Sequence, residues 1–329
     1  MPQPEISCGS PPRRDIVELA RRAEELGYAR FWVYDSPALY GDLWVALARI
    51  AEATRRIGLG TGVAVPSLRH PMVTASAIAT LEELAPGRLV CAFGTGFTAR
   101  RAMGKKPLAW ATVARQVQQV RALLRGETVL IDGAACAMIH SPGFAPKRPI
   151  EVPLWLAPMG PKGLAAAREA LADGVILPFE PAPGFARCAV LVSGTVLEAG
   201  EDHATPRVRE AAGGWFKTMY HAAWEQSPSA VDGLPGGAEW RRKIEALRPE
   251  GERHLAVHEG HVEAIPERER FLLEAAGPLL TRIGWTGDEA SVRARIEKAV
   301  AGGATEIAYM PSGPDIPREL AAFARAAKL

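Results

Sequence analysis

The stretch ELGYARFWVYD, residues 25–35, joins the end of an amphipathic helix to a short apolar strand through a glycine. A continuous apolar run is typical of a strand that is covered on both faces, as in a parallel sheet. The glycine supplies the left-handed backbone with which many helices end. The stretch therefore predicts one helix-to-strand step of an α/β fold. The same phrase recurs in RRIGLGTGVAVP (55–66), ELAPGRLVCAFG (83–94), ALADGVILP (170–178) and AGGATEIAYMP (301–311).

The spacing of these strands favours a (β/α)8 TIM barrel. Strand centres fall near residues 32, 59, 90, 155, 176 and 307, and further strands at 5–9 and 207–216 would make eight. Eight such units plus insertions fit one domain over residues 1–329, with a doubly wound sheet as the alternative. The stretch 215–280 is charged, helical and interrupted by Gly and Pro, and we expect it to be an insertion over one end of the barrel.

The composition favours a globular protein with a small-molecule ligand. Lys and Arg number 39 and Asp and Glu 37, and no basic stripe marks a nucleic-acid surface. The N-terminus lacks the apolar core of a signal peptide, and no stretch approaches the ~18 apolar residues of a membrane helix, so we expect a cytoplasmic protein. The cysteines lack metal-ligand spacing and are expected to be buried, reduced thiols; they are Cys8, Cys91, Cys136 and Cys188.

In a barrel of this kind, functional residues lie at the C-terminal ends of the strands. Asp35 ends one strand, where its carboxylate could accept a hydrogen bond from a ligand, act as a base or simply cap a turn. The glycines of FGTGF, residues 93–97, leave backbone amides accessible to a flat ring or an anion. Gly160, Pro161 and Lys162 begin a helix whose free N–H groups could bind phosphate, although a proline start and a surface lysine explain the same residues.

The segment GTGVAVPSLRHP, residues 60–71, follows an apolar run but lacks the third glycine of a dinucleotide-binding fingerprint. Gly60 and Gly62 inside a strand indicate that something flat packs against them. Pro71 suits the first turn of the next helix, which places His70 at the N-cap. We therefore expect His70 to be structural rather than catalytic.

HLAVHEGH, residues 254–261, spaces three histidines at i, i+4 and i+7. On a helix, His254, His258 and His261 would share one face and could bind a metal. Gly260 interrupts the helix, however, and no acidic ligand lies in an obvious register. We predict no metal site here and expect these histidines to face the substrate as proton carriers or hydrogen-bond donors, with a structural role as the alternative.

Together these stretches resemble the bacterial-luciferase-like flavin and deazaflavin oxidoreductases, especially the branch around methylenetetrahydromethanopterin reductase. The resemblance implies a TIM barrel that binds coenzyme F420, or FMN as the alternative, at the strand ends. It is carried by ELARRAEELGYARFWVYD (18–35), GVAVPSLRHPMVTASAIATLEELAPGRLVCAFGTG (62–96), VPLWLAPMGPKGLAAAREALADGVILP (152–178) and, less strongly, GDEASVRARIEKAVAGGATEIAYMP (287–311).

The resemblance also implies roles for individual residues. The third strand of this family ends in a non-prolyl cis peptide behind the redox ring, and the matching bond here is Gly62–Val63. Ser36 stands where many members have histidine, and residues 215–270 match poorly. The resemblance places Asp35 near the redox ring, and the histidine spacing described above adds His258 and His261, so catalytic roles are expected for these three residues. Cofactor binding is expected for Asp35, Gly62, Val63, Ala64, Gly94, Thr95, Gly96, Pro158, Met159, Gly160, Pro161, Lys162 and Pro178.

The function that the resemblance implies is hydride transfer between coenzyme F420 and a small organic substrate, with the protein supplying binding, orientation and a proton carrier. An FMN-dependent monooxygenase on the same barrel is a second hypothesis, and a nonenzymatic flavin-binding barrel is a third. Members of the family are commonly dimeric, so we expect a homodimer without nucleic-acid or membrane partners.

Overall fold

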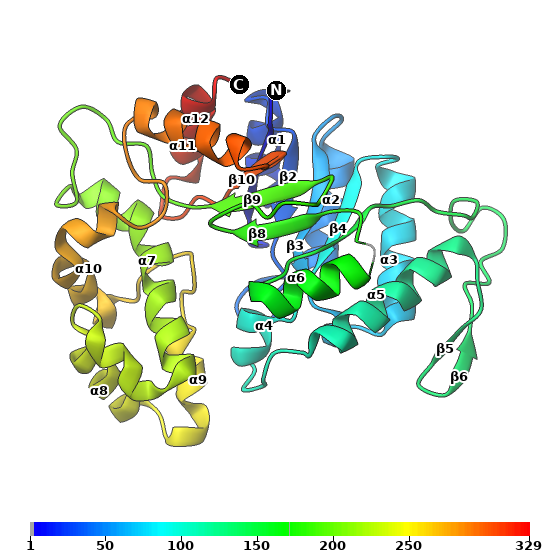
Figure 1. The fold of residues 1–329 in the computed structure, drawn as a ribbon, viewed down its shortest axis with the longest axis horizontal. Helices are drawn as coiled ribbons and strands as arrows, with labels where there is room; N and C mark the ends of the chain where they lie inside the picture. Colours follow the sequence, from blue (N-terminus) through cyan, green and yellow to red (C-terminus); the bar gives the residue numbers. More distant parts are fainter. Residues whose placement is uncertain (1–2, 171) are drawn as a thin grey trace.

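Eight parallel strands close into a barrel in the computed structural model, which describes residues 3–170 and 172–329 (Figure 1). Their order around the barrel is β1-β10-β9-β8-β7-β4-β3-β2, so the predicted TIM barrel is confirmed. The strands are β1 (Glu5–Ser10), β2 (Arg30–Val33), β3 (Gly58–Ala64), β4 (Leu89–Phe93), β7 (Leu154–Leu156), β8 (Val175–Pro178), β9 (Cys188–Val192) and β10 (Glu306–Tyr309).

Helices cover the outside of the barrel, and a small antiparallel hairpin extends from it. No helix stands between β8 and β9, which are joined by the loop 179–187. The helices around the barrel are α1 (Ile16–Glu25), α2 (Leu43–Ala53), α3 (Pro71–Leu84), α4 (Phe97–Arg101), α5 (Trp110–Arg125), α6 (Gly160–Glu169), α11 (Glu289–Ala301) and α12 (Ile316–Ala327), and the hairpin is β5 (Val129–Ile131) with β6 (Ala134–Cys136).

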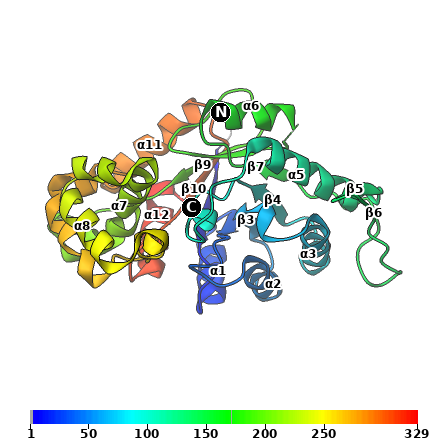
Figure 2. The same cartoon turned by 90° about the horizontal axis from the view of Figure 1, so that it is seen from below.

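Between β9 and α11 the chain forms a helical insertion with its own hydrophobic core. Figure 2 shows it on one side of the barrel, opposite the β5–β6 hairpin. In that core, Tyr220 packs edge-on against Phe216 and Trp240. The helices of the insertion are α7 (Pro206–Gln226), α8 (Gly237–Leu247), α9 (Arg253–Val257) and α10 (Phe271–Ala276).

The predicted seventh strand is wrong. Residues 207–216 belong to α7, and the seventh strand of the barrel is β9. Pro206 is well suited to the first turn of a helix, and Val208, Ala211 and Ala212 line one buried helical face. The sequence of β9 was overlooked because no helix separates it from β8. The insertion therefore begins at residue 206 rather than at 215.

Trp32 fills the interior of the barrel. Its indole nitrogen donates hydrogen bonds to Ser7 Oγ at 3.0 Å and Glu306 Oε1 at 2.9 Å. A Cβ atom on Gly60 would lie 2.2 Å from Cε3 of this ring. The flat group predicted to pack on Gly60 is therefore the chain's own tryptophan. Gly174 makes room for Trp155 in the same way, since a Cβ atom there would lie 2.5 Å from that indole.

Several smaller expectations can be compared with the structure. His70 is the N-cap of α3, and its Nδ1 accepts a hydrogen bond from the N–H of Met72 at 3.1 Å, which confirms the structural role. All four cysteines are free thiols. Cys8, Cys91 and Cys188 are buried, but Cys136 in the hairpin is only partly buried. Among residues 3–170 and 172–329, none of the helices is long and apolar enough to cross a membrane.

Candidate active site

At the end of β3 the backbone forms a bulge with a cis peptide bond between Gly62 and Val63. The register of β3 against β4 shifts between Thr61 and Ala64, and the carbonyl of Ala64 accepts a hydrogen bond from Gly94 N–H. Gly62 and Val63 are partly exposed, whereas their neighbours in β3 and Val65 are buried. The bulge thus presents backbone atoms toward the C-terminal end of the barrel.

The glycines after β4 make room for this bulge. A Cβ atom on Gly94 would lie 2.7 Å from Cγ2 of Val63, and one on Gly96 would lie 2.7 Å from Cγ1 of Val65. Thr95 lies between them, partly exposed, and its carbonyl accepts a hydrogen bond from the loop before α5. The structure therefore brings together the predicted residues of β3 and β4, and it explains both glycines by contact with the bulge.

Asp35, which follows β2, is buried, and its carboxylate is hydrogen-bonded within the chain. Its carboxylate accepts hydrogen bonds from Val65 N–H at 3.0 Å and from Arg69 Nη1 at 2.9 Å. Arg69 also bonds to Asp42 at 2.7 Å. Burial raises the pKa of Asp35, although the Arg69 guanidinium opposes the shift. These contacts favour a positioning role in which Asp35 holds the segment after the bulge; a direct role in proton transfer stays a prediction.

The predicted anion site lies after β7, at the start of α6. Met159, Gly160, Pro161 and Lys162 are all exposed, and no side chain caps the first turn of the helix. N–H groups in an uncapped first turn, together with a lysine, can bind phosphate. On the neighbouring strand β8, Pro178 is partly exposed and the following Phe179 is 78% exposed.

Pro158 differs from the other predicted residues of this loop. It is buried, and its side chain approaches Gly163 in the first turn of α6. A Cβ atom on Gly163 would lie 2.9 Å from both Pro158 and the Trp110 ring. Pro158 therefore helps to pack α6 onto the barrel, and its predicted contact with the cofactor remains untested.

The three spaced histidines do not share a helical face. α9 ends at Val257, and a turn through Gly260 carries His258 and His261 toward α7, where His221 joins them. His221 Nδ1 lies 2.7 Å from His261 Nδ1, and the ring centroids of His221 and His258 are 5.2 Å apart. His254 lies beside Gly104 instead. No spacing in the sequence links His221 to the other two, so sequence reasoning missed it.

His221, His258 and His261 form what we call the histidine cluster, and their imidazoles are mainly uncharged at neutral pH. Burial lowers the pKa of His258 to about 4 and that of His261 to about 3, and it lowers the pKa of His221 as well. His258 Nε2 is 3.1 Å from Glu225 Oε1, and His261 Nε2 is 3.1 Å from Thr98 Oγ1. An uncharged imidazole can accept a proton or bind a metal, so the cluster retains both chemical options.

The cluster lies where the insertion meets the barrel. Thr98 belongs to α4, directly after the β4 glycines, and Tyr40 of the loop after β2 donates a hydrogen bond to the carbonyl of His261. The next residue, Val262, packs among the side chains inside the barrel. The segment around His261 therefore closes part of the C-terminal end of the barrel.

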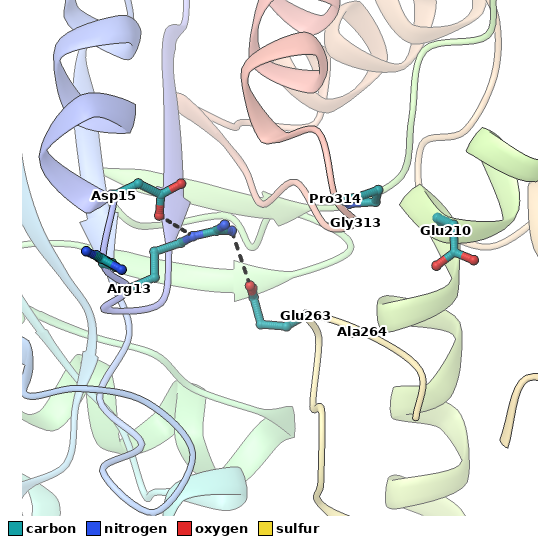
Figure 3. A pocket seen from close by; sticks show the side chains of 8 residues that line it. Arg13, Asp15, Glu210, Glu263, Ala264, Gly313 and Pro314 are labelled. Atoms are coloured by element: carbon teal, nitrogen blue, oxygen red, sulfur yellow. Dashed lines mark hydrogen bonds and ion pairs between the residues drawn. The ribbon is translucent and has the colours of Figure 1, made fainter. Parts of the chain in front are cut away.

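A cavity of about 430 Å³ lies beside this segment (Figure 3). Arg13, after β1, lies between Asp15 at 2.6 Å and Glu263 at 3.6 Å, and Glu210 of α7 lines the same cavity. Burial raises the pKa of Glu263 to about 7 in spite of the opposing Arg13 charge. A carboxyl group that titrates near neutral pH is a candidate acid or base. Sequence reasoning missed Glu263 because its pKa depends on the packing of the insertion.

The sequence model of the luciferase-like monooxygenase family matches residues 2–306. The 5,10-methylenetetrahydromethanopterin reductase of Methanolobus tindarius is 30% identical over 204 residues, which is 59% of each chain. The F420-dependent glucose-6-phosphate dehydrogenase of Amycolatopsis mediterranei (strain U-32) is 29% identical over 224 residues, or 63% of this chain and 61% of that protein. The chain thus spans less than two thirds of the length of these curated relatives.

A solved F420-dependent secondary alcohol dehydrogenase, in complex with an F420-acetone adduct, is similar over 99% of this chain and 98% of its own, with a TM-score of 0.67. Its sequence identity to this chain is 18%, so this likeness is evidence for the fold alone. The family match instead rests on sequence and extends from β1 into β10. With the closed barrel and the bulged third strand, it shows that the chain belongs to the luciferase-like monooxygenase family.

Proposed function

We propose that this protein transfers a hydride between coenzyme F420 and a small organic substrate. The choice of F420 as the cofactor is supported by the curated relatives, because a protein that matches this chain in sequence is named as an F420-dependent dehydrogenase. The observation that carries the proposal is the partly exposed bulge at Gly62–Val63, which Gly94 and the Asp35–Arg69 pair hold in place.

The residues at the strand ends fit such a cofactor. Exposed backbone at Gly62 and Val63 provides a surface for a flat ring, and the exposed Met159 and Phe179 add apolar contact after β7 and β8. The uncapped start of α6 with Lys162 would hold a phosphate of the cofactor. When bound, a deazaflavin supplies the hydride chemistry, and the protein supplies binding, orientation and a proton carrier.

For the proton, the chain offers a carboxyl group and an imidazole near the same end of the barrel. Glu263 lines the cavity and has a pKa of about 7, raised by burial. His261 is the partly exposed member of the histidine cluster, whereas His258 is 1% exposed and bonded to Glu225. We therefore rank Glu263 first as the group that exchanges a proton with the substrate, because an imidazole with a pKa of about 3 is a weak base at neutral pH. His261 ranks ahead of His258 by its exposure.

Separate titrations with coenzyme F420 and with FMN test the proposal, followed by turnover with reduced F420. We expect F420 to bind more tightly than FMN, and reduced F420 to pass its hydride to an added small organic acceptor without oxygen uptake. Binding of FMN alone, with oxygen uptake in the presence of reduced FMN, would replace the proposal with the monooxygenase. Binding without any turnover would favour a nonenzymatic role.

Lys162→Ala tests the phosphate contact. We expect the Kd for F420 to rise about threefold to tenfold, and the difference to shrink at high salt, because an exposed charge at a helix N-terminus is screened. Lys147→Ala, which removes another exposed lysine away from the strand ends, is the matched control. Equal affinities for the two variants would move the phosphate site elsewhere.

We also propose that the protein is a cytoplasmic homodimer that acts on a small molecule. Light scattering on the purified chain measures the mass of the assembly. A mass equal to that of one chain would contradict the dimer.

A further inference from the structure

We propose that His221, His258 and His261 bind a divalent transition-metal ion such as Zn²⁺. One ring nitrogen from each histidine can be chosen so that all three atoms lie within 4.8 Å of one another. Three imidazoles around an open fourth position form a common zinc site in proteins. This proposal is independent of the proposed cofactor, because it concerns the insertion and its contact with α4. It shares His261 with the proposed proton transfer, and a metal-bound His261 would leave Glu263 as the proton carrier.

The local backbone is shaped to bring these side chains together. Gly260 has a φ of +67°, and a Cβ atom there would lie 2.5 Å from the carbonyl oxygen of Ala264. The turn therefore requires glycine, and it places His258 and His261 on the same side. Lys217 of α7 fastens the turn by donating a hydrogen bond from Nζ to the carbonyl of Glu259 at 2.6 Å. His221 lies one helical turn beyond Lys217.

Within the described residues, the buried His258 Nδ1 has no hydrogen-bond partner, and His258 is only 1% exposed. His221 Nε2 is also unpaired, and a metal bound at Nδ1 of that ring would leave it so. Buried polar atoms are nearly always paired, so the unpaired nitrogen of His258 calls for an explanation. Glu225 faces His258 Nε2 and therefore holds the proton on that nitrogen, which leaves Nδ1 as a free electron pair. A carboxylate behind a histidine in this way is a frequent feature of metal sites.

The contact between His221 and His261 is the second indication. Their Nδ1 atoms lie 2.7 Å apart, so one of them carries a proton that the other accepts. A metal could take the place of this proton. Zn–N bonds of about 2.0–2.1 Å in a tetrahedral site set the ligand nitrogens about 3.3 Å apart, so the rings must move to turn the present spacing, up to 4.8 Å, into that of a bound ion. Thr98 Oγ1 would then orient His261 through Nε2, at 3.1 Å.

Two ion pairs stand beside the cluster and partly neutralise the cations nearest to it. Lys217 is paired with Glu269 at 2.8 Å, and Arg101 is paired with Glu225. Both carboxylates are largely buried beside their partners. The cations nearest the cluster are therefore each offset by a neighbouring carboxylate.

The test is to load the purified full chain with Zn²⁺ or Co²⁺, remove the excess and measure metal content and the visible spectrum. We expect one ion per chain and the visible absorption bands of tetrahedral Co²⁺. His258→Gln and His261→Gln should each weaken binding more than about 100-fold, and Glu225→Gln about 10- to 100-fold. His254→Gln, a histidine outside the cluster, should bind as the original chain does.

Far-UV circular dichroism distinguishes a lost ligand from a misfolded variant, and the spectrum of the unaltered chain with Co²⁺ does not depend on any variant. If the protein retains on average less than about a tenth of a metal ion per chain, the proposal is overturned and the cluster is a buried hydrogen-bonded group. Binding that survives both His258→Gln and His261→Gln also overturns it, because the ion then lies elsewhere. Neither readout depends on the F420 reaction.

Discussion

The barrel and the insertion are stabilised in different ways. Inside the barrel, glycine backbone lies directly against the Trp32 indole, so the fold is specified by close contact. In the insertion, Lys217 and Glu269 are both buried and form an ion pair, with Trp240 donating a further hydrogen bond to Glu269. The Trp32 contact in the barrel therefore depends on shape, whereas the Lys217–Glu269 contact in the insertion depends on paired charges. Substitutions should consequently damage the two regions by different mechanisms.

Lys217→Met should give the largest effect. Removing the cation leaves Glu269 buried with only Arg268 to offset its charge, which should lower the free energy of unfolding by about 3–5 kcal/mol. Urea unfolding followed by circular dichroism measures the loss. The double variant Lys217→Met/Glu269→Gln should recover most of it, because the buried charge is gone and the amide oxygen still accepts the hydrogen bond from Trp240. Arg248→Met, which breaks an exposed pair with Glu252, should cost less than about 1 kcal/mol. Equal losses of unfolding free energy for Lys217→Met and Arg248→Met would contradict the expected difference between the buried and the exposed ion pair.

Gly60→Ala probes the barrel and should cost about 3 kcal/mol. The new methyl group would meet the Trp32 ring at 2.2 Å, and a packed interior has no room to accommodate it. Combining it with Trp32→Leu should make the two losses less than additive, since the clash is gone. Gly251→Ala, where a Cβ atom meets nothing within 4 Å, should change stability by less than about 0.5 kcal/mol. If Gly60→Ala behaves like Gly251→Ala, the barrel does not depend on this contact.

Glu263→Gln probes the boundary between the two regions and should give the smallest effect. It should abolish a pH-dependent change in the free energy of unfolding on the order of 2–3 kcal/mol. The pKa of Glu263 is raised from 4.5 to about 7 by burial, so between these values the folded chain holds a proton that the unfolded chain releases. Stability should therefore fall as pH rises from about 4.5 to about 7, and stay at the lower level above that.

Glutamine cannot titrate, so the variant should lack this part of the pH dependence. Urea midpoints between pH 4.5 and pH 8.5 measure the difference. Glu267→Gln, at a side chain that is 92% exposed, should retain the slope of the original chain. Identical slopes for all three proteins would mean that Glu263 titrates normally in the folded state.

The barrel could be predicted because its signal is local. Each helix, glycine and apolar strand lies within about thirty residues, and seven of the eight barrel strands fall where the pattern placed them. The exception, β9, follows β8 without a helix, so the repeated phrase is missing there. The segment 207–216 was mistaken for a strand because its helical periodicity was not recognised.

The site was predicted less completely, since its properties arise from contacts between distant segments. The bulge at Gly62–Val63 was expected from family resemblance, and the exposed start of α6 from local sequence. In contrast, Arg69 on Asp35, Arg13 on Glu263 and His221 beside His261 join residues 34, 250 and 40 positions apart. Without an alignment or a structure, no pattern in the chain reveals such pairs.

The aromatic pairs in the two regions have an optical consequence. Trp32 and Trp155 lie 5.7 Å apart inside the barrel, and Trp224 and Trp240 lie 5.8 Å apart in the insertion. Indoles at such distances couple their electronic transitions, so each region carries its own signal in near-ultraviolet circular dichroism and in fluorescence. Replacing Trp155 or Trp224 by phenylalanine would remove one coupled pair at a time, while the other tryptophans still contribute. Difference spectra between the original chain and each variant can thus follow the melting of the barrel and that of the insertion separately without a label.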